Sequence, residues 1–403
     1  MMKHPRSLSW TLTYNSDVNA DLQGGQRTGA AYLQRVGLIA DADLDQLLGW
    51  RGARAHASVH AINGTGLSAH YVGNILTVSG LEAEPALRLF NLWIEQDLGR
   101  GASLRVGQFT AAQEFMISST ASLFVNSTFG WPGSFATDLP SGGPAYPLAA
   151  SGARLATMLG KGTAARIAIF AGDPAGPGRN DPQRRDVHGF NSWRFKGAPL
   201  VIGEAVRSFG GDDPTFLLGA GGWIHFDRFD DLRFDAQGRS LASPASSGEP
   251  RRHERNVAIY AFTDGRLWSD GRRSIHAFAR ASASPSDRNP VDLYGDAGFS
   301  FRGPLLARPI DTLGVSVGIA RISPHLRGLI HDRSASSAPG GPAPASEAVV
   351  EVSYQVKLSA HAYVQPDLQW IFHPAASLLS KDVSPQPARS RAIVAGLRAS
   401  LTL

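Results

Sequence analysis

Apolar and polar side chains alternate near the end of the chain. In residues 347–358 the even positions hold alanine, valine, tyrosine and leucine, while Glu351, Ser353, Gln355 and Lys357 hold odd positions. Residues 393–403 repeat the pattern. Because successive side chains of a strand point to opposite faces, each segment predicts a strand with one apolar face and one wet face.

Similar segments recur along the chain, each about as long as a strand that crosses a membrane. The candidates are 8–14, 29–41, 51–61, 87–97, 103–110, 152–159, 163–171, 188–195, 199–209, 215–226, 256–268, 274–284, 291–303, 311–323, 347–359, 362–372 and 390–402. A single-chain bacterial barrel has an even number of strands, so this odd list contains one error. The doubtful region is 188–226. Two or four strands there would put the neighbouring long loops at the same end of the barrel, and three would put them at opposite ends.

The connections between these segments are of two lengths. Tight turns fall at 98–102, 160–162 and 359–361, and long Gly/Pro/Ser-rich stretches at 111–150, 172–187, 227–255, 324–346 and 373–389. Outer-membrane barrels have short periplasmic turns and long extracellular loops. Residues 42–50 predict a short helical turn, and 333–346 a loop tip. We therefore predict an all-β, transmembrane antiparallel barrel of about 16 strands, with 18 as the alternative, and a single domain over 1–403.

The cost of burying charge assigns the two faces. An Arg or Lys facing lipid at the bilayer midplane costs about 2–4 kcal/mol, so charged strand residues are expected to point into the lumen. Leu313 and Phe299 then face lipid, and Trp370 and Phe372 join an aromatic girdle. The predicted pore-lining residues are Asn91, Glu95, Arg105, Arg154, Arg166, Arg280, Asp292, Asp296, Glu351, Asp367 and Arg398. The alternative is a packed polar interior whose ion pairs only hold the barrel together.

Composition excludes several classes of protein. No apolar run approaches the roughly 18 residues of a transmembrane helix, and Met1–Trp10 lacks the apolar core of a signal peptide. There is no cysteine. The net charge is +5, but the arginines are dispersed, which argues against nucleic-acid binding. We find no metal-ligand spacing and no cofactor fingerprint, and the GVSVG segment at 314–318 lies inside a predicted strand, so no enzyme is predicted.

Short segments in a fixed order carry a family resemblance. They are LWIEQ (92–96), LRVGQF (104–109), SLFVNSTFGWP (122–132), DLPSGGPAYPL (138–148), AGDPA (171–175), PQRR (182–185), DDLR (230–233), DRNPVDLY (287–294), ARISP (320–324), QPDLQ (365–369) and 396–403. This chain resembles the carbohydrate-selective porin family, the OprB-type glucose porins, from about residue 87 to its end. The resemblance implies a 16-stranded barrel in the bacterial outer membrane, passive uptake of glucose and related sugars, and an eyelet built by inward-folded loops. Leu403 departs from the usual terminal Phe, and the loops at 227–255 and 324–346 look individual.

Candidate eyelet residues lie in three places. The expected constriction loop, about 111–150, contains Glu114, Phe115, Trp131 and Asp138. Arg184, Arg185 and His188 stand at the start of a predicted strand, and Asp287 and Arg288 on a tight extracellular turn. Arginine donates several hydrogen bonds to sugar hydroxyls, and carboxylates accept them. The alternative roles are structural: Trp131 as a packing anchor, Arg184 and Arg185 as loop ties, and Asp287 and Arg288 as a turn-stabilising pair.

The expected partners are mono- and oligosaccharides and outer-membrane lipid. Porins are commonly homotrimers, but no segment marks a subunit interface. A general or organic-anion channel is the alternative function. A barrel enzyme would need a clustered catalytic set, and a transporter-type receptor would need a plug domain, and we see neither. We hypothesise that eyelet arginines make the pore sugar-permeable and mildly anion-favouring.

Overall fold

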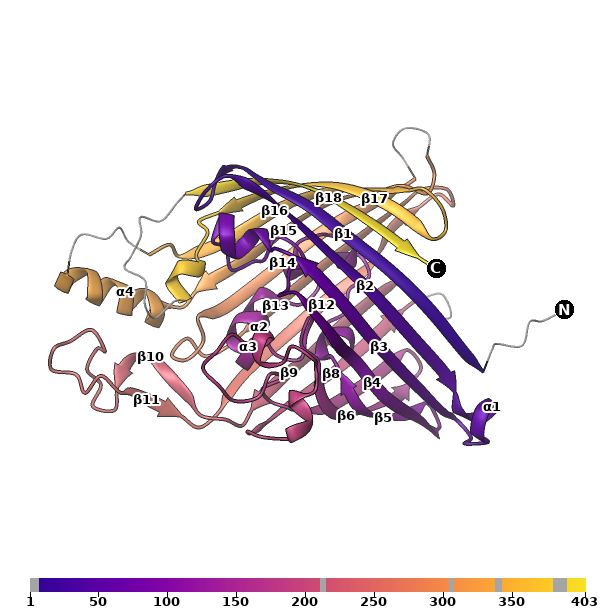
Figure 1. Cartoon of the computed structure of the whole chain (residues 1–403), viewed down its shortest axis with the longest axis horizontal. Coiled ribbons are helices and arrows are strands. Elements are labelled where there is room, and N and C mark those ends of the chain that lie inside the picture. Colours follow the sequence, from indigo (N-terminus) through magenta and orange to yellow (C-terminus); the bar gives the residue numbers. More distant parts are fainter. Residues whose placement is uncertain (1–6, 211–214, 304–307, 338–342, 380–389) are drawn as a thin grey trace.

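Sixteen antiparallel strands close into one barrel (Figure 1). The computed structural model describes residues 7–210, 215–303, 308–337, 343–379 and 390–403. The strands of the barrel are β1 (Leu8–Gly24), β2 (Gly29–Asp43), β3 (Ala53–Gly64), β4 (Ala86–Gly99), β5 (Ala102–Phe109), β6 (Ala150–Gly160), β7 (Thr163–Ala171), β8 (Pro199–Phe209), β9 (Phe216–His225), β12 (Asn256–Ser269), β13 (Ser274–Ala283), β14 (Val291–Arg302), β15 (Thr312–Ile322), β16 (Ser346–Lys357), β17 (Ala362–Phe372) and β18 (Arg391–Thr402). The ring closes where β1 pairs with β18, with Asp17 opposite Arg398.

The barrel confirms the predicted 16 strands and shows which candidate is false. Residues 188–195 are not a strand, because they contain the 3-10 helix η6 (Asn191–Arg194), and the backbone turns left-handed at Gly189 (φ 80°) and Phe195 (φ 47°). Only β8 and β9 remain in 188–226, so the long loops on either side lie at the same end. The prediction of 8–14 was too short, since β1 continues through Asn15–Gln23. There the outer positions hold Val18, Ala20 and Leu22, but the inner positions hold Asn and Asp, which strand propensity disfavours.

All the long connections lie at one end of the barrel, the loop end, and the described chain begins and ends at the opposite end, the short-turn side (Figure 1). That side carries α1 (Leu44–Leu48), the helical turn predicted within 42–50, whose N-terminus is capped by Asp43. The loop end carries the hairpin of β10 (Phe229–Asp235) and β11 (Pro250–His253), with α3 (Pro182–Arg185), α4 (Pro324–Ser337) and η7 (Ala376–Leu379).

The predicted loop at 324–346 contains α4, so its first part is helical. Two pieces of the predicted loops lie outside the described residues: 338–342 of the loop at 324–346, and 380–389 of the loop at 373–389. No helix among the described residues is long and apolar enough to cross a membrane.

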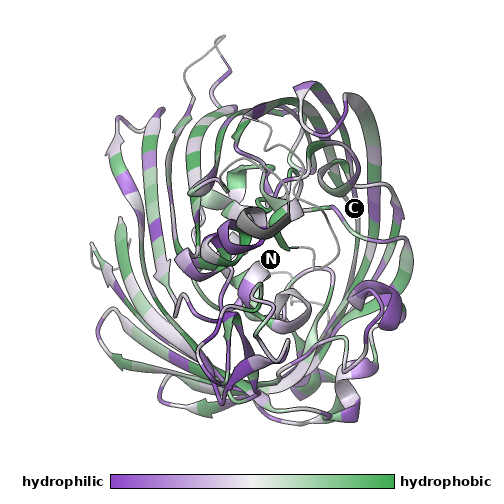
Figure 2. Cartoon of the chain, turned by 90° about the vertical axis from the view of Figure 1, so that its left-hand side faces the viewer, coloured by the Kyte–Doolittle hydropathy of each residue, from purple (hydrophilic) through white to green (hydrophobic). Residues whose placement is uncertain are grey.

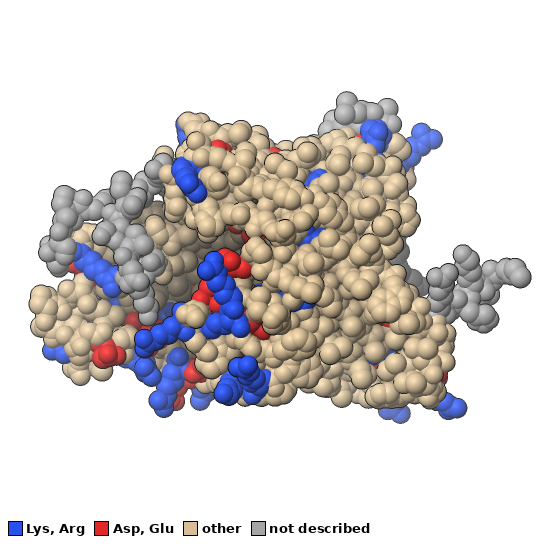
Figure 3. Space-filling model, in the orientation of Figure 1, with Lys and Arg blue, Asp and Glu red and all other residues tan. Residues whose placement is uncertain are grey.

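The outer wall is apolar and the inner wall polar, as the alternation predicted. Ile259 is 70% exposed and Phe299 50%, while Asp296, on the other face of the same strand as Phe299, is buried. Figure 3 shows a wall almost free of charge, with Lys and Arg gathered at the loop end, where the surface is hollowed. A large exposed apolar band of this kind marks a membrane-facing surface.

The hydrophobic core lies inside the barrel. Figure 2, viewed from the loop end, shows helical segments within the ring of strands. One core cluster joins Phe115 and Phe135, from the connection between β5 and β6, to inward-facing Phe109 of β5 and Tyr260 of β12. The lumen is therefore partly filled by chain that folds back from the loop end.

Candidate functional site in the barrel lumen

The connection between β5 and β6, the lumen loop, is tied to the inner wall by carboxylates. Its short helices are η2 (Ala111–Gln113), η3 (Ala121–Leu123), η4 (Ser127–Phe129), α2 (Gly133–Asp138) and η5 (Pro140–Gly142). Asp264 of β12 accepts hydrogen bonds from the backbone N–H and the hydroxyl of Thr120, both at 2.8 Å, and from the hydroxyl of Ser118. Glu204 of β8 accepts from the backbone N–H of Met116 at 2.6 Å. Hydrogen bonds to buried carboxylates are strong, so they fix the path of the loop.

Glu351 of β16 holds the middle of the lumen loop from the opposite side. Its carboxylate accepts from the backbone N–H groups of Val125 (2.7 Å) and Asn126 (2.9 Å). The side-chain amide of Asn126 donates to the carbonyl of Leu76 at 3.0 Å. Leu76 belongs to the connection between β3 and β4, where Glu347 accepts from its backbone N–H at 2.6 Å. A second inward segment, which contains the π-helix η1 (Ser68–Val72), is thus joined to the first.

Arg280 of β13 completes this set. Its guanidinium pairs with Asp296 of β14, with Nε 2.9 Å from Oδ1, and donates to the carbonyls of Thr128 (2.9 Å) and Gly130 (3.2 Å) in the lumen loop. The side chain of Arg280 is 1% exposed and that of Asp296 is fully buried. Both point inward but are sealed under the loop. We call Asp264, Arg280, Asp296 and Glu351 the loop clamp.

A different arrangement covers the wall formed by β4, β5 and β6. Glu95 lies 2.6 Å from Nη2 of Arg105 and 2.7 Å from Nη2 of Arg154. Glu114 of the lumen loop contacts Nη1 of Arg105 and lies 3.2 Å from Nε of Arg154. The side chains of Arg105 and Glu95 are 18% and 24% exposed, so these two members of the network are open to the lumen, whereas those of Arg154 and Glu114 are nearly buried, at 6% and 9%. We call these four residues the charge ladder.

An aromatic stack orients the ladder. The guanidinium carbon of Arg105 lies 3.7 Å from the ring centre of Trp93, and the Trp93 ring is stacked with His56 at 4.9 Å. Nδ1 of His56 is 2.7 Å from Oδ1 of Asp41. Arg166 of β7 extends the network: its Nε lies 3.6 Å from Glu204 and its Nη1 donates to the carbonyl of Glu114. Stacking of Arg on an aromatic ring restricts its orientation.

A third group faces the lumen where the ring closes. Arg398 of β18 donates two hydrogen bonds to Asp17 of β1, at 2.8 and 2.7 Å. Arg35 of β2 lies over the ring of Tyr146, with its guanidinium carbon 5.2 Å from the ring centre. Within the described part of the chain, Arg35 forms no ion pair.

Other predicted pore-lining residues have structural partners. Asn91 donates to the side chain of Gln113 at 3.2 Å, so it holds the lumen loop. Asp292 pairs with Arg321 at 2.8 Å near the loop end. Asp367 accepts from the amide of Gln369 at 2.9 Å.

Three predicted eyelet residues of the lumen loop, Phe115, Trp131 and Asp138, are buried. Phe115 is fully enclosed, and Trp131 contacts Phe135 edge-on and donates its indole N–H to the carbonyl of Gly142 at 3.0 Å. Asp138 accepts from the hydroxyl of Ser284 (3.1 Å) and the backbone N–H of Val291 (3.2 Å). Burial raises the pKa of Asp138 well above its ordinary value, because the charged form loses its hydration. These side chains shape the loop and are not presented to a passing solute.

The predicted arginine pair is on a helix, not at the start of a strand. Arg184 and Arg185 end α3, at the loop end. Arg184 is 3.2 Å from Glu84, and Arg185 is 3.6 Å from Asp173. The side chain of His188 is exposed. No contact between described residues joins this group to the charge ladder.

Asp287 and Arg288 lie between β13 and β14, at the loop end. Nε of Arg288 donates to Oδ1 of Asp287 at 2.7 Å, and its Nη1 donates to the carbonyl of Arg255 at 2.6 Å. His253 of β11 is 3.6 Å from Asp287. In this geometry the pair connects neighbouring loops.

The predicted site residues do not include Asp17, Arg35, Trp93, Glu204 or Asp264. The alternation along the strands could have identified Asp17 and Arg35, because both stand at positions of β1 and β2 whose side chains face the lumen. Trp93 shares the parity of Glu95 within LWIEQ. The roles of Glu204 and Asp264 depend on where the lumen loop runs, and strand alternation carries no information about that path.

A closed 16-stranded barrel with an apolar outer wall and a charged interior is an outer-membrane porin, and its fold is that of a channel rather than an enzyme. The chain belongs to the carbohydrate-selective porin, OprB family, whose family model matches residues 27–403. The bacterial outer membrane is therefore its location.

Three similar proteins share the fold with this chain but little of its sequence. Porin B of Pseudomonas aeruginosa is 23% identical over 397 residues, covering 92% of this chain and 84% of that protein. The high-pH structure of Pseudomonas putida OprB has a TM-score of 0.85 at 20% identity, covering 98% of this chain and 94% of that one. An anion-selective porin from Comamonas acidovorans has a TM-score of 0.52 at 12% identity, covering 98% of this chain and 99% of that one. At these identities the structural likeness concerns the fold.

Proposed function

We propose that the chain allows passive, selective diffusion of glucose and related mono- and oligosaccharides across the outer membrane. The observation that carries this proposal is the charge ladder. It sets two cations and two anions against one another on a wall that is open to the lumen. A balanced set of this kind offers donors and acceptors to a neutral, hydroxyl-rich solute without attracting ions of one sign.

We place the constriction at the lumen loop, over residues 111–150. Glu114 supports this assignment. It belongs to the lumen loop and pairs with Arg105 and Arg154, so it holds the loop against the wall that carries the charge ladder. The ladder groups already satisfy one another, so a sugar exchanges hydrogen bonds instead of gaining new ones. Binding of that kind is weak enough to release the solute.

Liposome swelling with glucose tests the proposal. Arg105→Met together with Glu95→Gln removes one cation and one anion, so the net charge of the lumen is unchanged and the methionine stem retains the contact with Trp93. We expect the glucose rate to fall roughly three- to tenfold, the equivalent of about one hydrogen bond. A rate equal to that of the parent would reject the ladder as the sugar path.

A general or organic-anion channel is the second candidate, and Arg35 favours it, since this luminal cation has no anionic partner among the described residues. The reversal potential under a salt gradient separates the two functions. An anion channel selects strongly for chloride, and a sugar channel of balanced charge selects weakly.

The number of chains in the assembly stays a prediction. A homotrimer is the state we propose to test first, and native mass spectrometry in detergent counts the chains directly. The solved porins of similar fold include one in trimer form, OmpT of Vibrio cholerae, with a TM-score of 0.52.

A further inference from the structure

The connection between β7 and β8 bends over the rim and lies against the outside of the barrel. Trp193 donates its indole N–H to the side chain of Gln108 at 2.6 Å. The hydroxyl and the carbonyl of Ser192 accept from the backbone N–H (3.0 Å) and the hydroxyl (2.7 Å) of Ser151. Gln108 and Ser151 have the outward parity of β5 and β6, opposite to that of Arg105. The segment is thus attached to the membrane-facing wall.

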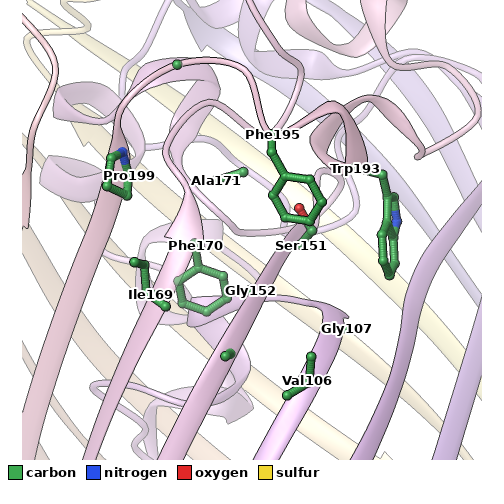
Figure 4. Close-up of a pocket in the computed structure, with 12 residues that line it drawn as sticks. Val106, Gly107, Ser151, Gly152, Ile169, Phe170, Ala171, Trp193, Phe195 and Pro199 are labelled. Atoms are coloured by element: carbon green, nitrogen blue, oxygen red, sulfur yellow. The ribbon is translucent and has the colours of Figure 1, made fainter.

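This outer segment and the wall enclose a groove of about 390 Å³ (Figure 4). It is lined by Val106, Ile169, Trp193, Phe195 and Pro199, and by Ala153 of β6, which pairs with Val106 in the wall. The lining is almost entirely apolar, and the volume is in the range of small-ligand sites.

Two cations alternate with the aromatic residues of the outer segment. Arg194 and Lys196 are exposed, as are Trp193 and Phe195, and neither cation forms an ion pair with another described residue. Phe195 takes up the left-handed backbone (φ 47°), which bulky residues rarely adopt, and in this conformation it borders the groove. The groove lies at the loop end of β5–β7, the level of the outer headgroups.

We propose that this groove binds one anionic, phosphate-bearing lipid of the outer leaflet, a lipid whose phosphate is not balanced by a headgroup cation as it is in phosphatidylcholine. The acyl chain lies between the wall and the aromatic rings, and the phosphate lies at Arg194 and Lys196. An apolar groove that opens on the bilayer is filled by acyl chain, and exposed Arg and Lys at headgroup level attract phosphate. This site is separate from the lumen, so it stands whether or not the pore carries sugar.

Native mass spectrometry of the whole chain in detergent tests the site. Phosphatidylglycerol and phosphatidylcholine with identical acyl chains are the probes. We expect one tightly bound phosphatidylglycerol. Arg194→Gln with Lys196→Gln is expected to weaken its binding roughly thirtyfold and to leave phosphatidylcholine binding unchanged, at about 1 kcal/mol for each cation. Ala153→Phe fills the groove and is expected to weaken both lipids.

The matched control is Arg251→Gln with Arg252→Gln on β11, which removes two exposed cations at the same end. An equal loss of phosphatidylglycerol in the control would overturn the site in favour of general charge attraction. Unchanged binding in Ala153→Phe would overturn the groove. Association of the chain with itself that Ala153→Phe abolishes would assign the groove to a second copy. An unchanged denaturant-unfolding midpoint shows that each variant is folded, whether or not the pore carries sugar.

Discussion

The charge ladder and the loop clamp place the same kinds of ionised side chain on the same face of one barrel, yet their surroundings differ. Arg105 and Glu95 of the ladder keep part of their surface in the lumen, whereas Arg280 and Asp296 of the clamp are sealed under the lumen loop. The strand pattern that points a charge inward is common to both. Whether that charge meets a solute or holds the loop depends on where the loop lies.

Removal of one member of each pair should separate the two regions most strongly. Arg280→Met leaves Asp296 buried without its cation, with only the hydroxyl of Tyr294 still donating to it, which typically costs about 3–5 kcal/mol. Arg105→Met leaves the partly exposed Glu95 still paired with Arg154 and should cost about 1 kcal/mol or less. Denaturant unfolding of the barrel measures both. Equal losses would show that the clamp and the ladder are not distinct.

Arg35 allows the passage of ions to be separated from the passage of sugars. Arg35→Met removes a luminal cation that belongs to neither region, and we expect anion preference to fall severalfold while glucose flux is kept. The reversal potential under a salt gradient, measured with the swelling rate, checks this. A parallel fall in both would mean that ions and sugars use the same groups.

Asp138 tests how the lumen loop responds to pH. Its raised pKa means that the folded chain keeps a proton that the unfolded chain loses above about pH 4. Its contribution to stability is therefore complete below that pH and is lost as the pH rises through the folded pKa. Asp138→Asn removes this dependence, so it should gain on the order of 1 kcal/mol relative to the parent at neutral pH and little at pH 4. Thermal unfolding of the parent and of Asp138→Asn at both pH values tests this prediction. A difference in stability between the two proteins that is the same at pH 4 and at neutral pH would contradict it.

The smallest effect is expected at the loop end. Arg184→Ala with Arg185→Ala removes two arginines that pair with Glu84 and Asp173, away from the ladder. We expect the glucose swelling rate to stay within about twofold of the parent, because neither pair includes a residue of the charge ladder; the Arg184–Glu84 pair is exposed and the Arg185–Asp173 pair is partly buried. A fall as large as that of the ladder variant would move the eyelet to this loop.

The sequence predicted the barrel better than the lumen. Alternation located all sixteen strands and pointed Arg105, Arg280 and Arg398 inward, because lipid penalises the other choice. It gave a false strand at 188–195, where alternating aromatic residues pack on the outer wall instead of pairing in the sheet. The alternation pattern could not predict the roles of Phe115 and Asp138, since these follow from contacts between the lumen loop and strands far along the chain.

Block of single-channel current by glucose tests the central claim most directly. In a planar bilayer, glucose should interrupt the current of the parent chain, and Arg105→Met with Glu95→Gln should weaken that block while leaving the conductance nearly unchanged. Block of equal strength in both proteins would show that sugars pass without touching the charge ladder.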